Sequence, residues 1–288
     1  MIYLERFAIP SPGAEEQFTN NIMRRCYNTV YPFGVFARRE LPELTFEPIT
    51  ILCGGNGCGK STLLNLIAEK LGVVRDTPGN RSSFFPDYVR LCRAELDPRA
   101  GQSFLHASRL VTSDDVFDYM LNLRAINEGV DQKREALFDE YTEAKHSAYR
   151  MRSMADYEEL KRHVAAQRLT QSAYVRKNLM ANLPERSNGE SALAYFTDTI
   201  KEDALYLLDE PENSLSAERQ LELQEYLVNS ARFYRCQFIL STHSPFLLAM
   251  RGAKVYDLDA DPVCVRPWTQ IASVRTYRDF FREHDAEF

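Results

Sequence analysis

The sequence predicts an α/β fold in which helices flank a mostly parallel β-sheet. Short apolar runs, such as Ile49–Cys53 and Ala204–Leu208, are typical of strands buried on both faces. Amphipathic helical patterns separate such runs, as at Ala217–Ala231. This alternation favours parallel strands joined by helices. A stretch without glycine or proline, from residue 131 to about residue 180, predicts a separate helical segment.

The N-terminal part predicts strands joined by irregular segments. Residues 2–8 are predicted as a strand, and Pro10–Gln17 as a loop or a short excursion. The aromatic-rich segment Arg25–Phe36 predicts a bent strand. Its Tyr31 and Phe33 are candidates for stacking on adenine, although aromatic side chains in strands are usually part of a core.

The strand Ile49–Cys53 leads into a turn that fits the phosphate-loop pattern G-x-x-x-x-G-K-[ST]. A helical pattern follows at Ser61–Leu71, and Gly72 is its expected stop. Glycines let backbone N–H groups converge on phosphate oxygens. We expect Lys60 to contact the β- and γ-phosphates of ATP and the Ser61 hydroxyl to hold Mg²⁺. The predicted nucleotide-binding residues are Gly54, Asn56, Gly57, Gly59, Lys60, Ser61 and Thr62.

The middle of the chain changes from irregular to helical. Val73–Gly101 is rich in Pro, Gly, Ser and Arg and predicts a long irregular connection. Phe104–Thr112 predicts a strand. Apolar residues at helical spacing from Val116 onward predict a helix that Gly129 would break, and residues 131–180 are then almost wholly helical.

This helical stretch is basic, with eight bases and three acids between Lys145 and Lys177 in a chain whose net charge is −6. A solvated helix face and a basic surface for nucleic acid or an acidic partner both explain this excess. The bases are Lys145, Arg150, Arg152, Lys161, Arg162, Arg168, Arg176 and Lys177.

The second half predicts further alternation of strands and helices. Ala192–Ile200 is predicted as a helix and Gln237–Leu240 as a buried strand. Val255–Leu258 and Val263–Val265 predict a closing hairpin. Arg275–His284 predicts a terminal helix, and we expect it to bury Tyr277, Phe280 and Phe281.

Acidic residues directly follow the buried strand Ala204–Leu208, and a histidine follows the next one. In a phosphate-loop protein, a carboxylate at the position of Asp209 supports Mg²⁺. Glu210, one residue further, is placed to polarise an attacking water as general base. His243 lies at the carboxyl edge of the predicted sheet, where ligands bind in such folds, and could hydrogen-bond the γ-phosphate.

A Ser-Asn-Gly segment lies 22 residues before Asp209. Ser187 and Gly189, just before a helix, offer hydroxyl and N–H donors for an anion. The same residue types are also common in turns and helix N-caps, so both interpretations stay open.

Together, these motifs in this order resemble the ATP-binding cassette (ABC) class of ATPases. The resemblance makes residues 54–62 the Walker A motif and Leu205–Glu210 the Walker B motif with its catalytic glutamate. His243 corresponds to the switch histidine. A variant signature is formed by Ser187, Asn188, Gly189, Glu190 and Ser191, and the D-loop includes Ser214 and Ser216.

The resemblance also implies a domain organisation and a mechanism. Residues 1–114 and 183–288 would form the ATPase core, with an antiparallel N-terminal subdomain, and residues 115–182 an inserted helical lid. Two chains would pack head to tail as a homodimer, with each ATP between the phosphate loop of one chain and the signature of the other. Mg²⁺-dependent hydrolysis at Glu210 would open the dimer.

Two features of the sequence depart from the patterns of this class. The transporter-type Q-loop glutamine is not evident; by position, Ser113 or Asp114 replaces it, and Gln102 lies too early. The motif style of Tyr206–Glu212 and Phe238–Pro245 resembles stand-alone bacterial ATPases of the "AAA family ATPase" or SMC/RecF-like type. The inserted helices are far shorter than an SMC arm, and no C-x-x-C zinc hook is present.

The expected function is therefore an ATPase that couples hydrolysis to DNA, RNA or a protein partner through residues 131–180, in DNA repair or phage defence. A transporter subunit and a regulatory ATP-binding module with negligible turnover are the alternatives. The six scattered cysteines suit free thiols in a reducing cytoplasm. With neither a signal peptide nor an 18-residue apolar run, we expect a cytoplasmic protein without membrane insertion.

Overall fold

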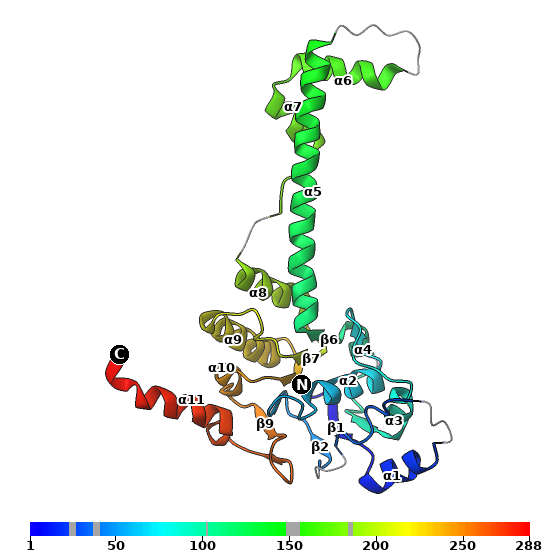
Figure 1. The fold of residues 1–288 in the computed structure, drawn as a ribbon, viewed down its shortest axis with the longest axis vertical. Helices are drawn as coiled ribbons and strands as arrows, with labels where there is room; N and C mark the ends of the chain where they lie inside the picture. Colours follow the sequence, from blue (N-terminus) through cyan, green and yellow to red (C-terminus); the bar gives the residue numbers. More distant parts are fainter. Residues whose placement is uncertain (23–26, 37–40, 102, 148–155, 184–186) are drawn as a thin grey trace. The chain divides into compact units, whose positions relative to one another are not determined.

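The computed structural model describes residues 1–22, 27–36, 41–101, 103–147, 156–183 and 187–288. Two compact units make up the chain (Figure 1). The first unit combines residues 1–117 and 188–288, and the second consists of residues 118–187. The first boundary falls inside helix α5, Ser113–His146.

A seven-stranded sheet forms the centre of the first unit, in the order β10-β9-β3-β8-β7-β6-β4. Every neighbouring pair is parallel except β9 and β10, so the mostly parallel sheet is confirmed. All residues of β3 and β8 are buried, because helices cover both faces. The strands are β3 Ile49–Cys53, β4 Val74–Arg75, β6 Arg109–Thr112, β7 Leu205–Asp209, β8 Gln237–Ser241, β9 Lys254–Asp257 and β10 Cys264–Val265.

A second, antiparallel sheet has the order β2-β1-β5, as the resemblance implied. Its strands are β1 Leu4–Ala8, β2 Leu44–Thr45 and β5 Arg93–Leu96. The buried Gln237 side chain ties this sheet to β8. Its Oε1 accepts the N–H groups of Tyr3 at 2.7 Å and Leu4 at 2.9 Å, and its Nε2 donates to the Leu4 carbonyl at 2.9 Å.

The helices of the first unit include the phosphate-loop helix α2, Lys60–Leu71. Its N-cap Gly59 and its C-cap Gly72 both have positive φ, and Gly72 confirms the predicted stop. The other helices are α1 Pro12–Asn20, α3 Phe85–Leu91, α4 Ser103–Ala107, α8 Asn188–Thr199, α9 Ala217–Phe233, α10 Pro245–Leu248 and α11 Ala272–Glu283, with 3₁₀ turns at Trp268–Gln270 and Asp285–Glu287.

The second unit is helical and has its own small core. Helix α5 continues through Gly129, so the predicted break is wrong. Helices α6 Tyr157–Arg168 and α7 Gln171–Asn178 follow. Residues 148–155, including Arg150 and Arg152, lie outside the described part. The core residues are Leu137, Tyr141, Ala144, Ala166, Tyr174 and Val175. No helix in the described ranges is both long and apolar enough to cross a membrane.

Several predictions failed where short elements lack a periodic pattern. The loop expected at Pro10–Gln17 is helix α1, which Ser11 caps by accepting the Ala14 N–H at 3.3 Å. Val73–Gly101 contains β4, α3 and β5 instead of one irregular connection. Its Phe85 and Tyr88 are buried, so tertiary packing outweighs the local Pro and Gly content.

One further strand was predicted wrongly, and another was right only in its second half. Phe104–Thr112 divides into helix α4 and strand β6. Residues 27–36 form turns and bends, and residues 25 and 26 lie outside the described part. Phe33 and Phe36 are nevertheless buried, so the aromatic pattern marked a core rather than a strand.

The terminal helix α11 exists, but its expected burial is wrong. Tyr277, Phe280 and Phe281 are 49%, 54% and 53% exposed, whereas Val274 is buried. A helix that packs by a narrow stripe leaves its remaining apolar residues in solvent.

Candidate nucleotide-binding site

The phosphate loop has a backbone that requires glycine at defined places. Gly54, Gly57 and Gly59 have φ angles of 151°, 78° and 101°, which side chains with a Cβ rarely adopt. A Cβ at Gly59 would lie 2.6 Å from Cε1 of Phe36, and one at Gly54 would lie 2.7 Å from Sγ of Cys58. The loop can therefore turn tightly between β3 and α2.

Lys60 is buried within this loop, at 5% exposure. Its Nζ donates to the carbonyl oxygens of Gly54 at 2.9 Å and Gly55 at 3.2 Å. It also lies 2.7 Å from Nε2 of His243. Because an ammonium group can only donate, Nε2 is the acceptor in this contact.

Glu210 completes a cluster at the carboxyl ends of β3, β7 and β8. Its Oε1 lies 3.3 Å from Nε2 of His243 and 3.9 Å from Nζ of Lys60. Its backbone has a φ of 49° and is held by an N–H bond to the Ser241 carbonyl at 3.1 Å. Its other carboxylate oxygen accepts the Asn213 amide at 3.1 Å. The three residues predicted at separate strand ends therefore meet.

Ser61 and Asp209 form a second pair beside this cluster. The Ser61 hydroxyl donates to Oδ1 of Asp209 at 3.0 Å, and the Ser241 hydroxyl donates to the same oxygen at 2.5 Å. Burial raises the pKa of Asp209 above its ordinary value. A hydroxyl and a carboxylate fit Mg²⁺, which takes one or two carboxylates together with phosphate oxygens and water. The described residues contain no cluster of three or more His, Cys, Asp or Glu that could hold a metal.

Glu212 and Asp259 belong to the site but were not assigned to it from the sequence. Oε1 of Glu212 accepts the N–H groups of His243 at 2.6 Å and Ser244 at 3.2 Å, which fixes the histidine segment. Oδ2 of Asp259 accepts the Gly55 N–H at 2.5 Å. Because Glu212 is an acidic residue directly after Pro211 and close to Glu210, the sequence could have indicated it as a site residue. No local pattern links Asp259 to a loop 204 residues away.

The remaining loop residues differ in their surroundings. Asn56 is exposed, and Thr62 Oγ1 accepts the Tyr31 hydroxyl at 3.0 Å. Tyr31 also stacks on Phe85, with ring centroids 6.0 Å apart. Phe33 stacks on Phe18 at 4.5 Å inside the core, so it offers no free ring face to adenine.

The signature segment lies against the D-loop and α9. Asn188 is the first residue of α8, and Ser187 directly precedes it. Glu190 pairs with Arg219 of α9 at 3.3 Å. A Cβ at Gly189 would lie 3.6 Å from Cγ of Arg219 and 3.7 Å from the Ser214 carbonyl oxygen, both ordinary contacts.

The D-loop residues Ser214 and Ser216 play different local roles. Ser216 caps α9 by accepting the Arg219 N–H at 3.4 Å. Ser214 has a φ of 98°, and its buried hydroxyl has no hydrogen-bond partner among the described residues. Both the left-handed backbone of Ser214 and its buried hydroxyl are energetically costly for a serine.

The candidates for the Q-loop position stand at the start of α5. Ser113 follows Thr112, which pairs in register with Asp209 of β7. Asp114 is exposed, whereas its neighbour Asp115 accepts the Thr112 N–H at 2.7 Å and the Thr77 N–H at 3.0 Å. Asp115 therefore fixes this turn, and Gln102 lies outside the described residues.

A protein-family model described as "AAA domain, putative AbiEii toxin, Type IV TA system" matches residues 180–249. The matched segment holds the predicted signature residues, Asp209, Glu210 and His243. A search of curated proteins finds no match.

Solved structures with related folds include two SMC heads. The Smc head domain of Pyrococcus furiosus with an extended coiled coil, bound to the C-terminal domain of ScpA, has a TM-score of 0.44 and 13% identity, covering 98% of this chain and 99% of that one. The SMC head domain of Thermotoga maritima gives 0.39 and 11%, covering 92% and 99%. A dimeric ATP-binding cassette bound to ADP and Pi gives 0.36 and 14%, covering 75% and 83%.

Similarity at these TM-scores does not assign an activity to this chain, whereas the geometry of its own sheet can be described directly. That geometry places a phosphate loop after β3, two acidic residues at the end of β7 and a histidine after β8 of one mostly parallel sheet. The matched family segment contains the last two of these features. The chain therefore has a mixed α/β fold in which a phosphate loop, two acidic residues and a histidine lie at the carboxyl ends of parallel strands.

Proposed function

We propose that this protein binds ATP with Mg²⁺ and hydrolyses it. The supporting observation is the meeting of Lys60, Glu210 and His243, with Nζ, Oε1 and Nε2 within 2.7 to 3.9 Å of one another. Three strand ends bring a cation, a base and a hydrogen-bonding ring to one point beside the phosphate loop. Phosphoryl transfer depends mainly on such positioning and on charge stabilisation.

Each residue has a defined role in this proposal. Mg-ATP, when bound, supplies the scissile phosphoanhydride and the cation that neutralises it. Lys60 exchanges its loop carbonyl partners for phosphate oxygens, and Ser61 and Asp209 hold the cation. Glu210 orients and deprotonates the attacking water, and His243 contacts the γ-phosphate. The loop N–H groups from Gly54 to Thr62 cradle the phosphates.

We further propose that turnover needs a head-to-tail homodimer. The signature residues Ser187, Asn188, Gly189 and Glu190 would contact the ATP held by the partner chain, with Ser214 and Ser216 beside them. The start of helix α8 at Asn188 supports this, because helix N-termini favour phosphate.

The decisive experiment is Glu210→Gln, which keeps the side-chain volume but removes the base. We expect hydrolysis to fall by at least about 100-fold while ATP binding remains, which traps an ATP-bound dimer visible by light scattering. Glu218→Gln, on the first turn of α9, is the matched control. A Glu210→Gln protein that stays monomeric with Mg-ATP would contradict the sandwich, and unchanged turnover would contradict the assigned base.

Hydrolysis would be coupled to a nucleic-acid or protein partner through residues 131–180. Deleting this segment should leave ATP binding intact and abolish partner binding. Co-purification with a membrane subunit would instead favour a transporter component, and turnover at background would favour a regulatory module.

A further inference from the structure

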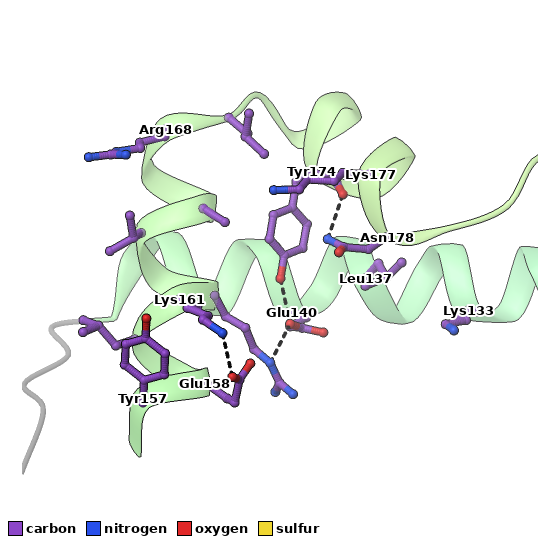
Figure 2. A pocket seen from close by; sticks show the side chains of 15 residues that line it. Lys133, Leu137, Glu140, Tyr157, Glu158, Lys161, Arg168, Tyr174, Lys177 and Asn178 are labelled. Atoms are coloured by element: carbon purple, nitrogen blue, oxygen red, sulfur yellow. Dashed lines mark hydrogen bonds and ion pairs between the residues drawn. The ribbon is translucent and has the colours of Figure 1, made fainter. Parts of the chain in front are cut away.

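A cleft of about 810 Å³ lies among helices α5, α6 and α7 of the second unit (Figure 2). Five bases and two acids line it, so its side chains contribute a net charge of about +3 at neutral pH. The bases come from all three helices. The charged lining residues are Lys133, Lys161, Arg162, Arg168, Lys177, Glu140 and Glu158.

Both acids already have partners. Glu158 accepts Nζ of Lys161 at 2.8 Å. Glu140 accepts the hydroxyl of the buried Tyr174 at 2.7 Å, a contact drawn as a dashed line in Figure 2. Glu140 also lies 3.6 Å from Nε of Arg162. Both carboxylates that line the cleft are therefore already paired.

Three bases of the cleft remain uncompensated. Lys133, Arg168 and Lys177 have no ion pair and no side-chain hydrogen bond within the described ranges. They lie on α5, α6 and α7 respectively. Cations distributed around an open cleft match a ligand with charges spread along its length better than a single carboxylate.

Helix α6 presents one continuous face to this cleft. Tyr157, Lys161, Val164 and Arg168 follow one another at spacings of four, three and four residues, which places them on one side of a helix. Tyr157 is 47% exposed and Val164 39% exposed. Nζ of Lys161 lies 4.7 Å from the centroid of the Tyr157 ring. An exposed ring therefore stands among bases.

We propose that this cleft binds a single-stranded nucleic acid, with phosphates on Lys133, Arg168 and Lys177 and a base stacked on Tyr157. The proposal deepens the proposed function, because it names the partner of the helical segment. Single strands are bound sequence-independently by basic grooves with aromatic stacking platforms. An acidic peptide would contact the cations but would not stack on the Tyr157 ring. An experiment can therefore distinguish it from a single-stranded nucleic acid.

The test is fluorescence anisotropy of the full-length protein with labelled 15-mers of oligothymidylate and oligouridylate at several salt concentrations. The variants are Lys133→Ala with Lys177→Ala, and a control of equal charge, Arg176→Ala with Arg251→Ala, outside the cleft. We expect the cleft variant to flatten the log–log salt slope by about 1.4, at about 0.7 for each lost phosphate contact. The control should keep the wild-type slope.

Variants at Tyr157 distinguish a nucleic-acid ligand from a peptide ligand. Tyr157→Phe should bind the oligonucleotides like wild type, whereas Tyr157→Leu, which keeps an apolar side chain without a ring, should bind about tenfold more weakly. A labelled polyglutamate peptide serves as the rival probe. Its binding in place of the oligonucleotides would overturn the proposal, as would oligonucleotide binding that Tyr157→Leu and the cleft variant leave unchanged. Preference for either 15-mer supports it and identifies DNA or RNA.

Binding is measured without nucleotide, and ATP turnover is measured in parallel. Turnover without binding of either 15-mer would overturn this inference and leave the ATPase intact. Binding without turnover would overturn the ATPase proposal alone.

Discussion

The two halves of the candidate ATP site differ in how they are held. Lys60 in the phosphate-loop half is 5% exposed and bound by two loop carbonyls and His243. In the signature half, Ser187, Asn188 and Glu190 are exposed, and Glu190 pairs with Arg219 at the surface. The phosphate-loop half is organised by this chain alone. The signature half presents its groups outward, as contact with another chain's nucleotide would require.

Lys60→Ala should have the largest effect, because it removes the only lysine of the loop. We expect turnover to fall by about 100-fold or more, in the range for removing one charge-stabilising donor. Initial rates of phosphate release measure this. Lys70→Ala on the same helix, where Nζ donates to the Val89 carbonyl at 3.2 Å, should keep turnover. Equal losses in both variants would show that the helix, rather than the site, was damaged.

Gly189→Glu should affect the signature half of the proposed ATP site without affecting the phosphate-loop half. The position tolerates a Cβ, so Gly189→Ala should behave like wild type, whereas the glutamate places a negative charge where a partner's phosphates are expected. We expect turnover to drop by about tenfold or more while ATP affinity of the monomer stays within about twofold. Titration calorimetry and turnover assays measure the two quantities. A parallel loss of ATP affinity would place the signature in the same chain's site.

Asp209→Asn should stabilise the protein without ATP. Burial raises the pKa of Asp209, so the folded state binds this proton more tightly than the unfolded chain, and stability is lost as pH rises from about 4 through the folded-state pKa. Asparagine does not titrate, so the gain should be larger at pH 7 than at pH 4, with about 2–4 °C in Tm for each kcal/mol. Thermal melts check this, with the exposed Asp198→Asn as control. A gain independent of pH would contradict it.

Asp259→Asn should have the smallest effect. Its Oδ2 accepts the Gly55 N–H, and asparagine keeps an acceptor there but removes a negative charge close to the expected phosphates. We expect ATP binding to tighten by about threefold at low salt and less at high salt. Titrations at two salt concentrations decide this. Weaker binding would mean that the carboxylate is needed to shape the loop.

Sequence reasoning succeeded where one local pattern determines the structure. The buried strands β3 and β7 and helix α2 follow from apolar runs and glycine stops, and they place Lys60 and Asp209. Helix α1 and the segment 73–101 were missed because their short elements depend on distant packing, as with Phe85 and Tyr88.

The site shows the same limit. The sequence placed Glu210 and His243 at the carboxyl ends of two buried strands, which pair in parallel in the structure. No local sequence pattern predicted that Asp259 contacts the phosphate loop, because the two contacting residues are 204 positions apart in the sequence. The sequence indicated the cleft of the second unit only as an excess of bases. The structure shows which three of its lining bases have no ion pair within the described ranges.

In the proposed dimer, Ser214 would make the stability of the chain depend on protein concentration. A buried hydroxyl without a hydrogen-bond partner, as at Ser214 among the described residues, and a left-handed backbone each cost about 1–3 kcal/mol. If the partner chain of the proposed dimer supplies the missing bond, dimerisation regains part of that free energy. Melting temperature would then rise with protein concentration, which makes the abundance of the chain in a cell a determinant of how well it is folded.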